Sequence, residues 1–147
     1  MPGRYIFLKS SSLDHYKAVF AAHCFDDRFR PATEKFLASL GNPHYDIVSV
    51  AGGAKIFSSP EKESDRDFML RELEKSIVLH HTSRVMLFTH YDCGAYGGLA
   101  HFAGDEEKQF AFHEDELRKA AAAVREKFSG LAIETYFIDK EGIVQVK

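Results

Sequence analysis

Short apolar blocks alternate with amphipathic helical patterns along this chain, and no other feature of the sequence restricts its fold as strongly. Residues 19–22, 47–50 and 85–88 are almost continuously apolar, and residues 131–138 form a fourth block. Continuously apolar strands are typical of parallel sheets that are covered on both faces. Strands that alternate with helices favour right-handed crossovers between parallel neighbours. We therefore predict an α/β fold, a three-layer domain with a mostly parallel central sheet of about four strands.

Two amphipathic helices are predicted between the first three strands. The first begins near Pro31, whose fixed backbone angle suits an initial helical turn, and ends at Gly41. The second has its apolar stripe over residues 69–77. Ser64 and Asp67 are spaced like a capping box, so we expect this helix to begin at Ser64.

The end of the chain predicts a third helix and a closing hairpin. Glu114 and Asp115 suit the first turn of this helix, because acidic side chains stabilise a helix N-terminus, and Gly130 suits its end. Residues 139–142 have the composition of a tight turn. Residues 143–146 are therefore predicted to form an antiparallel C-terminal edge strand.

Length and composition exclude several classes of protein. The 147 residues show no internal repeat or domain boundary, so we predict one domain over residues 1–147 in which segment 4–8 is a further strand or an arm. The net charge of −3 argues against a nucleic-acid partner or a basic membrane patch. No apolar run reaches the ~18 residues of a membrane span, and no signal peptide is visible. Two cysteines are too few for a disulfide framework, and we expect a cytoplasmic protein.

Side chains able to bind a metal or a small ligand follow three of the predicted strands directly. They are Cys24, Asp26 and Arg28 after the first strand, the glycine-rich turn 51–54 after the second, and His90 and Cys93 after the third. In open parallel sheets, ligands bind beyond the carboxyl ends of the strands. We therefore expect one functional site at this edge of the sheet.

The residue types at this edge favour a zinc site. Two thiolates and one imidazole, from Cys24, Cys93 and His90, form a set that zinc binds tetrahedrally, and three protein ligands leave one position open, as in catalytic sites. An Arg28 guanidinium can hold the Asp26 carboxylate by two hydrogen bonds and so orient it beside the metal.

Plainer explanations of the same residues stay open. Cys24 and Cys93 could be buried thiols that pack as small apolar groups, or a disulfide, which a reducing cytoplasm disfavours. Asp26 and Arg28 could form only a surface ion pair, worth about 0–1 kcal/mol.

The pattern as a whole resembles the β-class carbonic anhydrases. Cys24, Asp26 and Arg28 match the Cys-x-Asp-x-Arg signature of that family, and His90 and Cys93 match its His-x-x-Cys signature. The resemblance covers residues 18–147 and includes the final hairpin. It implies a zinc ion on the two cysteines and the histidine, with Asp26 and Arg28 as a catalytic dyad. The implied reaction is the attack of zinc hydroxide on carbon dioxide to give bicarbonate.

The resemblance also implies features outside this set. The glycines at the strand ends, Gly52, Gly53 and Gly94, are predicted to line the substrate pocket. A second form of the site, in which Asp26 itself binds the zinc, is known in the family. The family further implies a homodimer or a larger homo-oligomer, with carbon dioxide and bicarbonate as the small-molecule partners.

Other functions stay open. The chain could keep the fold and the metal but serve as a zinc-binding or small-molecule-binding module, or hydrolyse another small electrophile such as a sulfur analogue of carbon dioxide. A nucleotide-binding function is disfavoured, because no Gly-x-Gly-x-x-Gly loop follows the first strand. A proton-shuttle role for His101 or His113 is a further hypothesis.

Overall fold

The predicted alternation of strands and helices is present in the computed structural model, which describes residue 3 and residues 14–42 and 44–147. Five strands form one sheet in the order β2-β1-β3-β4-β5. Their bounds are Val19–His23 for β1, Tyr45–Ser49 for β2, Arg84–His90 for β3, Ala132–Ile138 for β4 and Ile143–Val146 for β5. Strands β1 to β4 pair in parallel and β5 pairs with β4 in the antiparallel direction, so the predicted fold class is confirmed.

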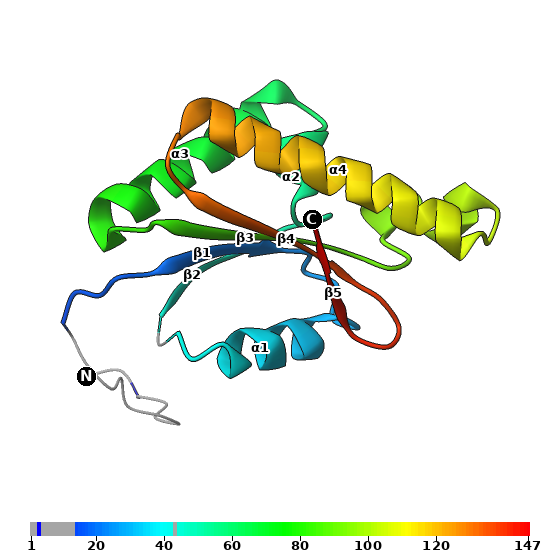
Figure 1. Cartoon of the computed structure of the whole chain (residues 1–147), viewed down its shortest axis with the longest axis horizontal. Helices are drawn as coiled ribbons and strands as arrows, with labels where there is room; N and C mark the ends of the chain where they lie inside the picture. Colours follow the sequence, from blue (N-terminus) through cyan, green and yellow to red (C-terminus); the bar gives the residue numbers. More distant parts are fainter. Residues whose placement is uncertain (1–2, 4–13, 43) are drawn as a thin grey trace.

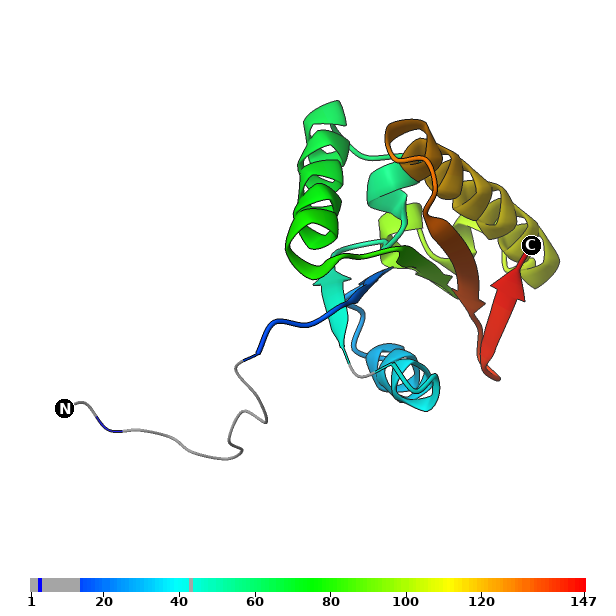
Figure 2. The ribbon, with the colours of Figure 1, turned by 60° about the vertical axis from the view of Figure 1, so that its left-hand side comes forward.

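Helices cover both faces of the sheet and give the predicted three layers. Helix α1 lies alone on one face, whereas α2, α3 and α4 lie together on the other (Figure 1 and Figure 2). The helices are α1 (Arg30–Ser39), α2 (Lys55–Ser58), α3 (Glu63–His80) and α4 (Glu106–Lys127). Two short 3-10 helices, η1 (Gly94–Tyr96) and η2 (Leu99–Phe102), connect β3 to α4.

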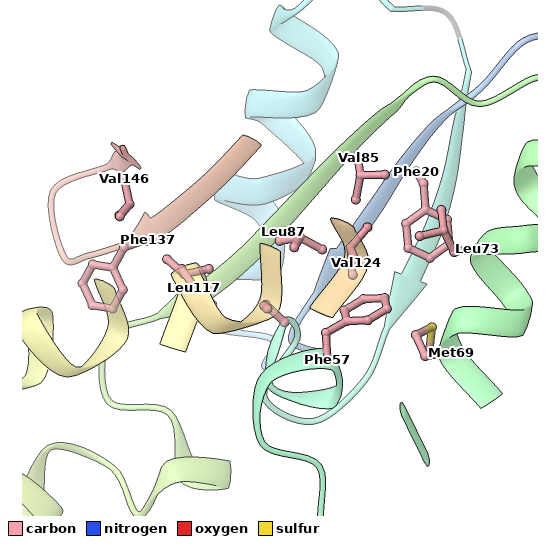
Figure 3. Close-up of a cluster of buried hydrophobic side chains, with 13 residues drawn as sticks. Phe20, Phe57, Met69, Leu73, Val85, Leu87, Leu117, Val124, Phe137 and Val146 are labelled. Carbon is pink, nitrogen blue, oxygen red and sulfur yellow. The ribbon is translucent and has the colours of Figure 1, made fainter. Parts of the chain in front are cut away.

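Two apolar clusters, one on each face of the sheet, join the layers. On the face of α2, α3 and α4, the ring of Phe57 packs among side chains from all three helices and from the sheet, Leu73 and Leu87 included (Figure 3). On the opposite face, Leu37 of α1 belongs to a second cluster with Phe88. Leu87 and Phe88 are neighbours in β3 and enter different clusters, because successive side chains of a strand point to opposite faces. This alternation explains why the sequence of β3 is continuously apolar.

We predicted that both faces of strand β2 are covered by other parts of the chain, but one of its faces is partly exposed. Ile47 is 51% exposed, although it lies on the α1 face of the sheet beside Ala21 of β1. The ring of Phe36 in α1 packs on Phe88 and Tyr136, which belong to β3 and β4. Helix α1 thus covers the other half of the sheet, and β2 is left as a partly exposed edge strand.

The starts of two helices also differ from the prediction. Helix α3 begins at Glu63, and its N-cap residue is Lys62 without a side-chain cap, so the capping box at Ser64 is wrong. Helix α4 begins at Glu106, eight residues before Glu114. Asp105 is its N-cap, and the carboxylate accepts a hydrogen bond from the backbone N–H of Lys108. Acidic residues occur throughout this helix, so those at 114 and 115 did not mark its start.

The closing hairpin has the predicted form. Asp139 Oδ1 accepts hydrogen bonds from the backbone N–H groups of Glu141 and Gly142, which closes the turn before β5. Segment 4–8 lies outside the described residues. In the described part of the chain, no helix combines the length and the apolar character that crossing a bilayer requires.

Candidate metal centre

Neighbouring strands bring three potential metal ligands together. Cys24 follows β1 directly, His90 is the last residue of β3, and Cys93 comes three residues later. Because β1 and β3 pair in parallel, their carboxyl ends meet at the same edge of the sheet. The Sγ atoms of the two cysteines and a ring nitrogen of His90 all lie within 4.8 Å of one another, and all three residues are buried. Neither cysteine forms a disulfide.

The ring of His90 is oriented for metal binding. Its Nδ1 donates a hydrogen bond to the backbone oxygen of Tyr91 at 2.7 Å, and the ring stacks on Phe29 with the ring centroids 4.5 Å apart. A histidine that donates from Nδ1 presents the lone pair of Nε2 to a metal. The buried Nε2 atom has no hydrogen-bond partner within the described ranges. A metal ion between Nε2 and the two sulfur atoms would supply the missing partner.

The two thiols also suit a metal ion. The Cys93 thiol donates a hydrogen bond to Cys24, which holds the pKa of Cys24 below its ordinary value and raises the pKa of Cys93. The backbone N–H of Gly52 donates to Cys24 Sγ at 3.3 Å and also favours the thiolate. A bound zinc ion would replace the shared proton, because its cysteine ligands are deprotonated. The Cys-His-Cys set therefore fits zinc.

The glycines of the second strand end have different geometric roles. A Cβ atom on Gly53 would lie 2.4 Å from the backbone oxygen of Phe88 and 2.8 Å from the backbone nitrogen of Cys24, so only glycine fits there. Gly52 has a φ of +80°, which favours glycine. A Cβ atom on Gly94 would meet no described atom within 4 Å. Gly52 and Gly53 thus shape the backbone around Cys24, and the pocket-lining role predicted for the three glycines stays a prediction.

Asp26 and Arg28 lie beside the cluster as a bidentate pair. Arg28 Nη2 donates to Asp26 Oδ2 at 2.7 Å, and Arg28 Nε donates to Oδ1 at 3.1 Å. These hydrogen bonds lower the pKa of Asp26 to about 2. Asp26 Oδ2 lies 3.9 Å from His90 Nε2. An ionised carboxylate is therefore held next to the nitrogen atom that would bind the metal.

The matches with known proteins agree with this geometry. A family model described as "Putative carbonic anhydrase" matches residues 15–147. The chain belongs to this family. An uncharacterized protein of Rickettsia bellii is 26% identical over 142 residues, which cover 91% of this chain and 87% of that protein.

Two solved structures show that the fold of this carbonic anhydrase family member is shared. The carbonic anhydrase of Streptococcus mutans matches with a TM-score of 0.63 and 19% identity, over 94% of this chain and 88% of that chain. A β-carbonic anhydrase of Trichomonas vaginalis matches with a TM-score of 0.63 and 14% identity, over 95% and 87% of the two chains. The chain thus has a fold like that of the β-carbonic anhydrases, with a Cys-His-Cys cluster that resembles a zinc site.

Sequence reasoning missed two residues beside the site of this family member. Asp92 Oδ2 accepts a hydrogen bond from Arg28 Nη1 at 3.0 Å, and its backbone N–H donates to Gln109 Oε1 at 2.7 Å. Asp92 lies between His90 and Cys93 in the sequence, and this position could have indicated that it is close to the site. Gln109 gave no such signal, because helix α4 was predicted to begin after it.

Helix α4 also carries buried polar groups near the candidate metal centre. His113 is 0% exposed, packs on Tyr96 and Phe137, and has no hydrogen-bond partner in the part of the chain that the structure describes. Burial lowers its pKa to about 4. The ring therefore has no direct contact with solvent, which does not suit the hypothesis of a proton shuttle. Glu116, also buried, accepts hydrogen bonds from the hydroxyl groups of Ser58 and Ser59.

Proposed function

We propose that this chain is a zinc-dependent hydro-lyase that interconverts carbon dioxide and bicarbonate. The observation that carries the proposal is the unpartnered Nε2 atom of His90, which faces two thiols and has the Arg28-held carboxylate of Asp26 at 3.9 Å. Cys24, His90 and Cys93 would hold the zinc ion. When bound, zinc lowers the pKa of a water molecule towards neutrality and so supplies a nucleophile.

Asp26 has the geometry and the charge to orient that water molecule. Its pKa of about 2 keeps the carboxylate ionised at neutral pH, so it accepts hydrogen bonds and does not donate them. Two hydrogen bonds from Arg28 fix the plane of the carboxylate, which fixes the direction of its lone pairs. Asp26 thus acts as the acceptor and Arg28 as the group that holds it.

A pocket of about 230 Å³ lies next to the Gly52 turn. Its lining combines apolar side chains, Val50, Ile56 and Ala95 among them, with the charged side chains of Lys55, Glu61 and Asp65. We propose that Gly52, Gly53 and Gly94 let the backbone approach carbon dioxide closely at this edge of the sheet. Phe25, which follows Cys24, is 62% exposed. We propose that a second copy of the chain covers it in a homo-oligomer.

Stopped-flow hydration of carbon dioxide, on protein whose zinc content is measured first, tests the proposed function. We expect about one zinc per chain and a hydration rate well above that of the uncatalysed reaction. Asp26→Asn removes the charge of the acceptor and should lower kcat by 10²-fold or more, within the range for general acid–base groups. Asp27→Asn is the matched control, because it makes the same change of charge one residue away in the exposed pair with Arg30.

Three outcomes would overturn the proposal in different ways. Zinc-loaded protein that hydrates carbon dioxide no faster than Asp26→Asn would be a zinc-binding module. Hydrolysis of a sulfur analogue of carbon dioxide by the same preparation, without hydration of carbon dioxide, would instead point to the hydrolase alternative. Protein that takes up no zinc would remove the metal site itself.

A further inference from the structure

Arg28 lies between two carboxylates, and the proposed function uses only one of them. Its Nε and Nη2 atoms donate to Asp26, while Nη1 donates to Asp92 Oδ2 at 3.0 Å and Nη2 also donates to the backbone oxygen of Asp92 at 3.1 Å. All three guanidinium nitrogens are therefore engaged. One side of the guanidinium faces the loop after β1, and the other faces the turn that carries two of the metal ligands.

Asp92 is fixed in place independently of Arg28. Its Oδ1 atom accepts a hydrogen bond from the backbone N–H of Leu99 at 2.8 Å, and its own N–H donates to the buried Gln109. The backbone of Asp92 is left-handed, with a φ of 53°. Gly98, next to Leu99, has a φ of +68°, which favours glycine, and a Cβ atom there would lie 2.8 Å from Oδ1. One carboxylate oxygen is thus bound to the loop, which leaves the other to hold Arg28.

Without this second anchor, the pair of Asp26 and Arg28 would be weakly held. The Arg28 side chain is 57% exposed, so water screens its attraction to Asp26 and competes for its hydrogen bonds. Asp26 Oδ2 lies 3.9 Å from His90 Nε2, close to the position of a bound metal. A carboxylate oxygen is itself a good zinc ligand. A small movement of Asp26 would therefore let it take the open coordination position.

We propose that Asp92 is a positioning residue that holds Arg28, and through Arg28 keeps Asp26 off the metal. The inference rests on the zinc site of the proposed function, but not on the hydration of carbon dioxide. The fourth coordination position stays open to water or an anion only while Asp92 retains Arg28. Loss of the Asp92 charge leaves Arg28 with only the backbone oxygen of Asp92 on that side, and so lets Arg28 move and the Asp26 carboxylate bind the metal.

Asp92→Asn separates this role from the structure of the loop. The amide oxygen of asparagine still accepts from Leu99 N–H, but the amide NH₂ faces the Arg28 donors and cannot accept from them. The probe is Co²⁺ bound in place of zinc, titrated with azide while the visible absorption is recorded. We expect Asp92→Asn to need at least tenfold more azide than the wild type, because Asp26 occupies the open position.

Three further variants make the outcome decisive. The double variant Asp26→Asn/Asp92→Asn should return to the azide affinity of the wild type, because the competing carboxylate is gone. Asp92→Glu keeps a charge for Arg28 and should lie close to the wild type. Asp27→Asn changes the charge of the same region without touching Arg28, and should leave the titration unchanged.

The results that would overturn the inference are specific. Azide affinity in Asp92→Asn equal to that of the wild type, or still weakened in the double variant, would show that Asp26 does not compete for the metal. Loss of cooperative thermal unfolding in Asp92→Asn would give Asp92 a purely structural role. Protein with the expected azide shifts but without hydration of carbon dioxide would keep this inference and remove the proposed function. Protein that hydrates carbon dioxide but lacks the expected azide shifts would keep the proposed function and remove this inference.

Discussion

Gln109 Oε1 lies 2.7 Å from the backbone nitrogen of Asp92, so helix α4 is bonded directly to the turn that carries His90 and Cys93. Gln109 is buried, and the turn therefore has a fixed support on the side of the sheet that faces away from α1. Hydrogen-bond partners behind the ligands of a metal are often as important as the ligands, because they set the direction in which the ligands point.

Gln109→Leu removes this support while it keeps the size of the side chain. The backbone N–H of Asp92 is left without an acceptor, and we expect the free energy of unfolding to fall by about 1–3 kcal/mol. Zinc affinity should fall about 10- to 100-fold, as it does when such supporting groups are lost. Urea unfolding and competition with a chelator measure the two effects. Gln145→Leu on the exposed strand β5 is the control, and an equal loss of zinc affinity there would contradict the explanation.

The buried ring of His113 predicts a pH dependence of stability. Its pKa is about 4 in the folded chain and 6.5 ordinarily. Between pH 6.5 and pH 4 the unfolded chain binds a proton that the folded chain does not, so stability falls as the pH falls through this window. The full contribution of this one group is about 3 kcal/mol, and it does not grow further below pH 4.

His113→Phe should remove this contribution. The difference in unfolding free energy between the variant and the wild type should shift in favour of the variant as the pH falls from 7.5 to 4.5. Urea unfolding at several pH values measures it, and the comparison of two chains cancels the other titrating groups. For His101→Gln, which changes an exposed histidine, the plot of unfolding free energy against pH should run parallel to that of the wild type. Parallel curves for His113→Phe would show that the ring is not buried in its neutral form.

Substitution by alanine should affect stability differently at Gly53 and at Gly94. Gly53→Ala places a methyl group against two backbone atoms and demands a left-handed alanine, so we expect a loss of about 2–5 kcal/mol in unfolding free energy. Gly94→Ala meets open space and should leave stability nearly unchanged. Thermal unfolding measures both. If hydration falls in Gly94→Ala at unchanged stability, the predicted role of Gly94 in the pocket is supported, whereas unchanged kinetics would contradict it.

Zinc should stabilise the folded chain at the expense of the unfolded one. At a zinc concentration of 1,000 times the dissociation constant, binding to the folded state alone adds about 4 kcal/mol. We expect a chelator to lower Tm and zinc to restore it. Cys93→Ser should lose most of this zinc-dependent rise, because the hydroxyl group is a poorer ligand than a thiolate. A rise in Tm that is the same in Cys93→Ser would place the stabilising zinc elsewhere.

The sequence predicted the candidate metal ligands because strand ends are visible in the apolar pattern. Cys24, His90 and Cys93 follow apolar blocks directly, and neighbouring parallel strands had to bring those positions to one edge. The structure confirms the cluster and the fold class. It also shows the Asp26–Arg28 pair, whose members are only two residues apart in the sequence.

The missed residues depend on contacts between segments that are distant in the sequence. The link from Gln109 to Asp92 forms only when α4 lies across the end of β3, and no local pattern reports that placement. The helix start at Asp105 was missed for a different reason, since several acidic residues compete as N-terminal signals. The exposure of Ile47 depends on which half of the sheet α1 covers, which the amphipathic pattern of α1 does not specify.

The candidate metal centre lies where two strands of the sheet separate. Strands β1 and β3 pair only as far as Ala22 and Leu87, and beyond that point the oxygen of Phe88 bonds to the backbone nitrogen of Ala54. The chain segment that separates the two strands passes through Gly53, where even a methyl group would not fit. Main chain alone therefore fills the gap between the two strand ends, and the Cys24, His90 and Cys93 side chains cluster at that end of the strands. To engineer this centre into another parallel sheet, the two cysteines and the histidine would not be enough. The design would also need a backbone segment without side chains between the ends of two strands, as at Gly53.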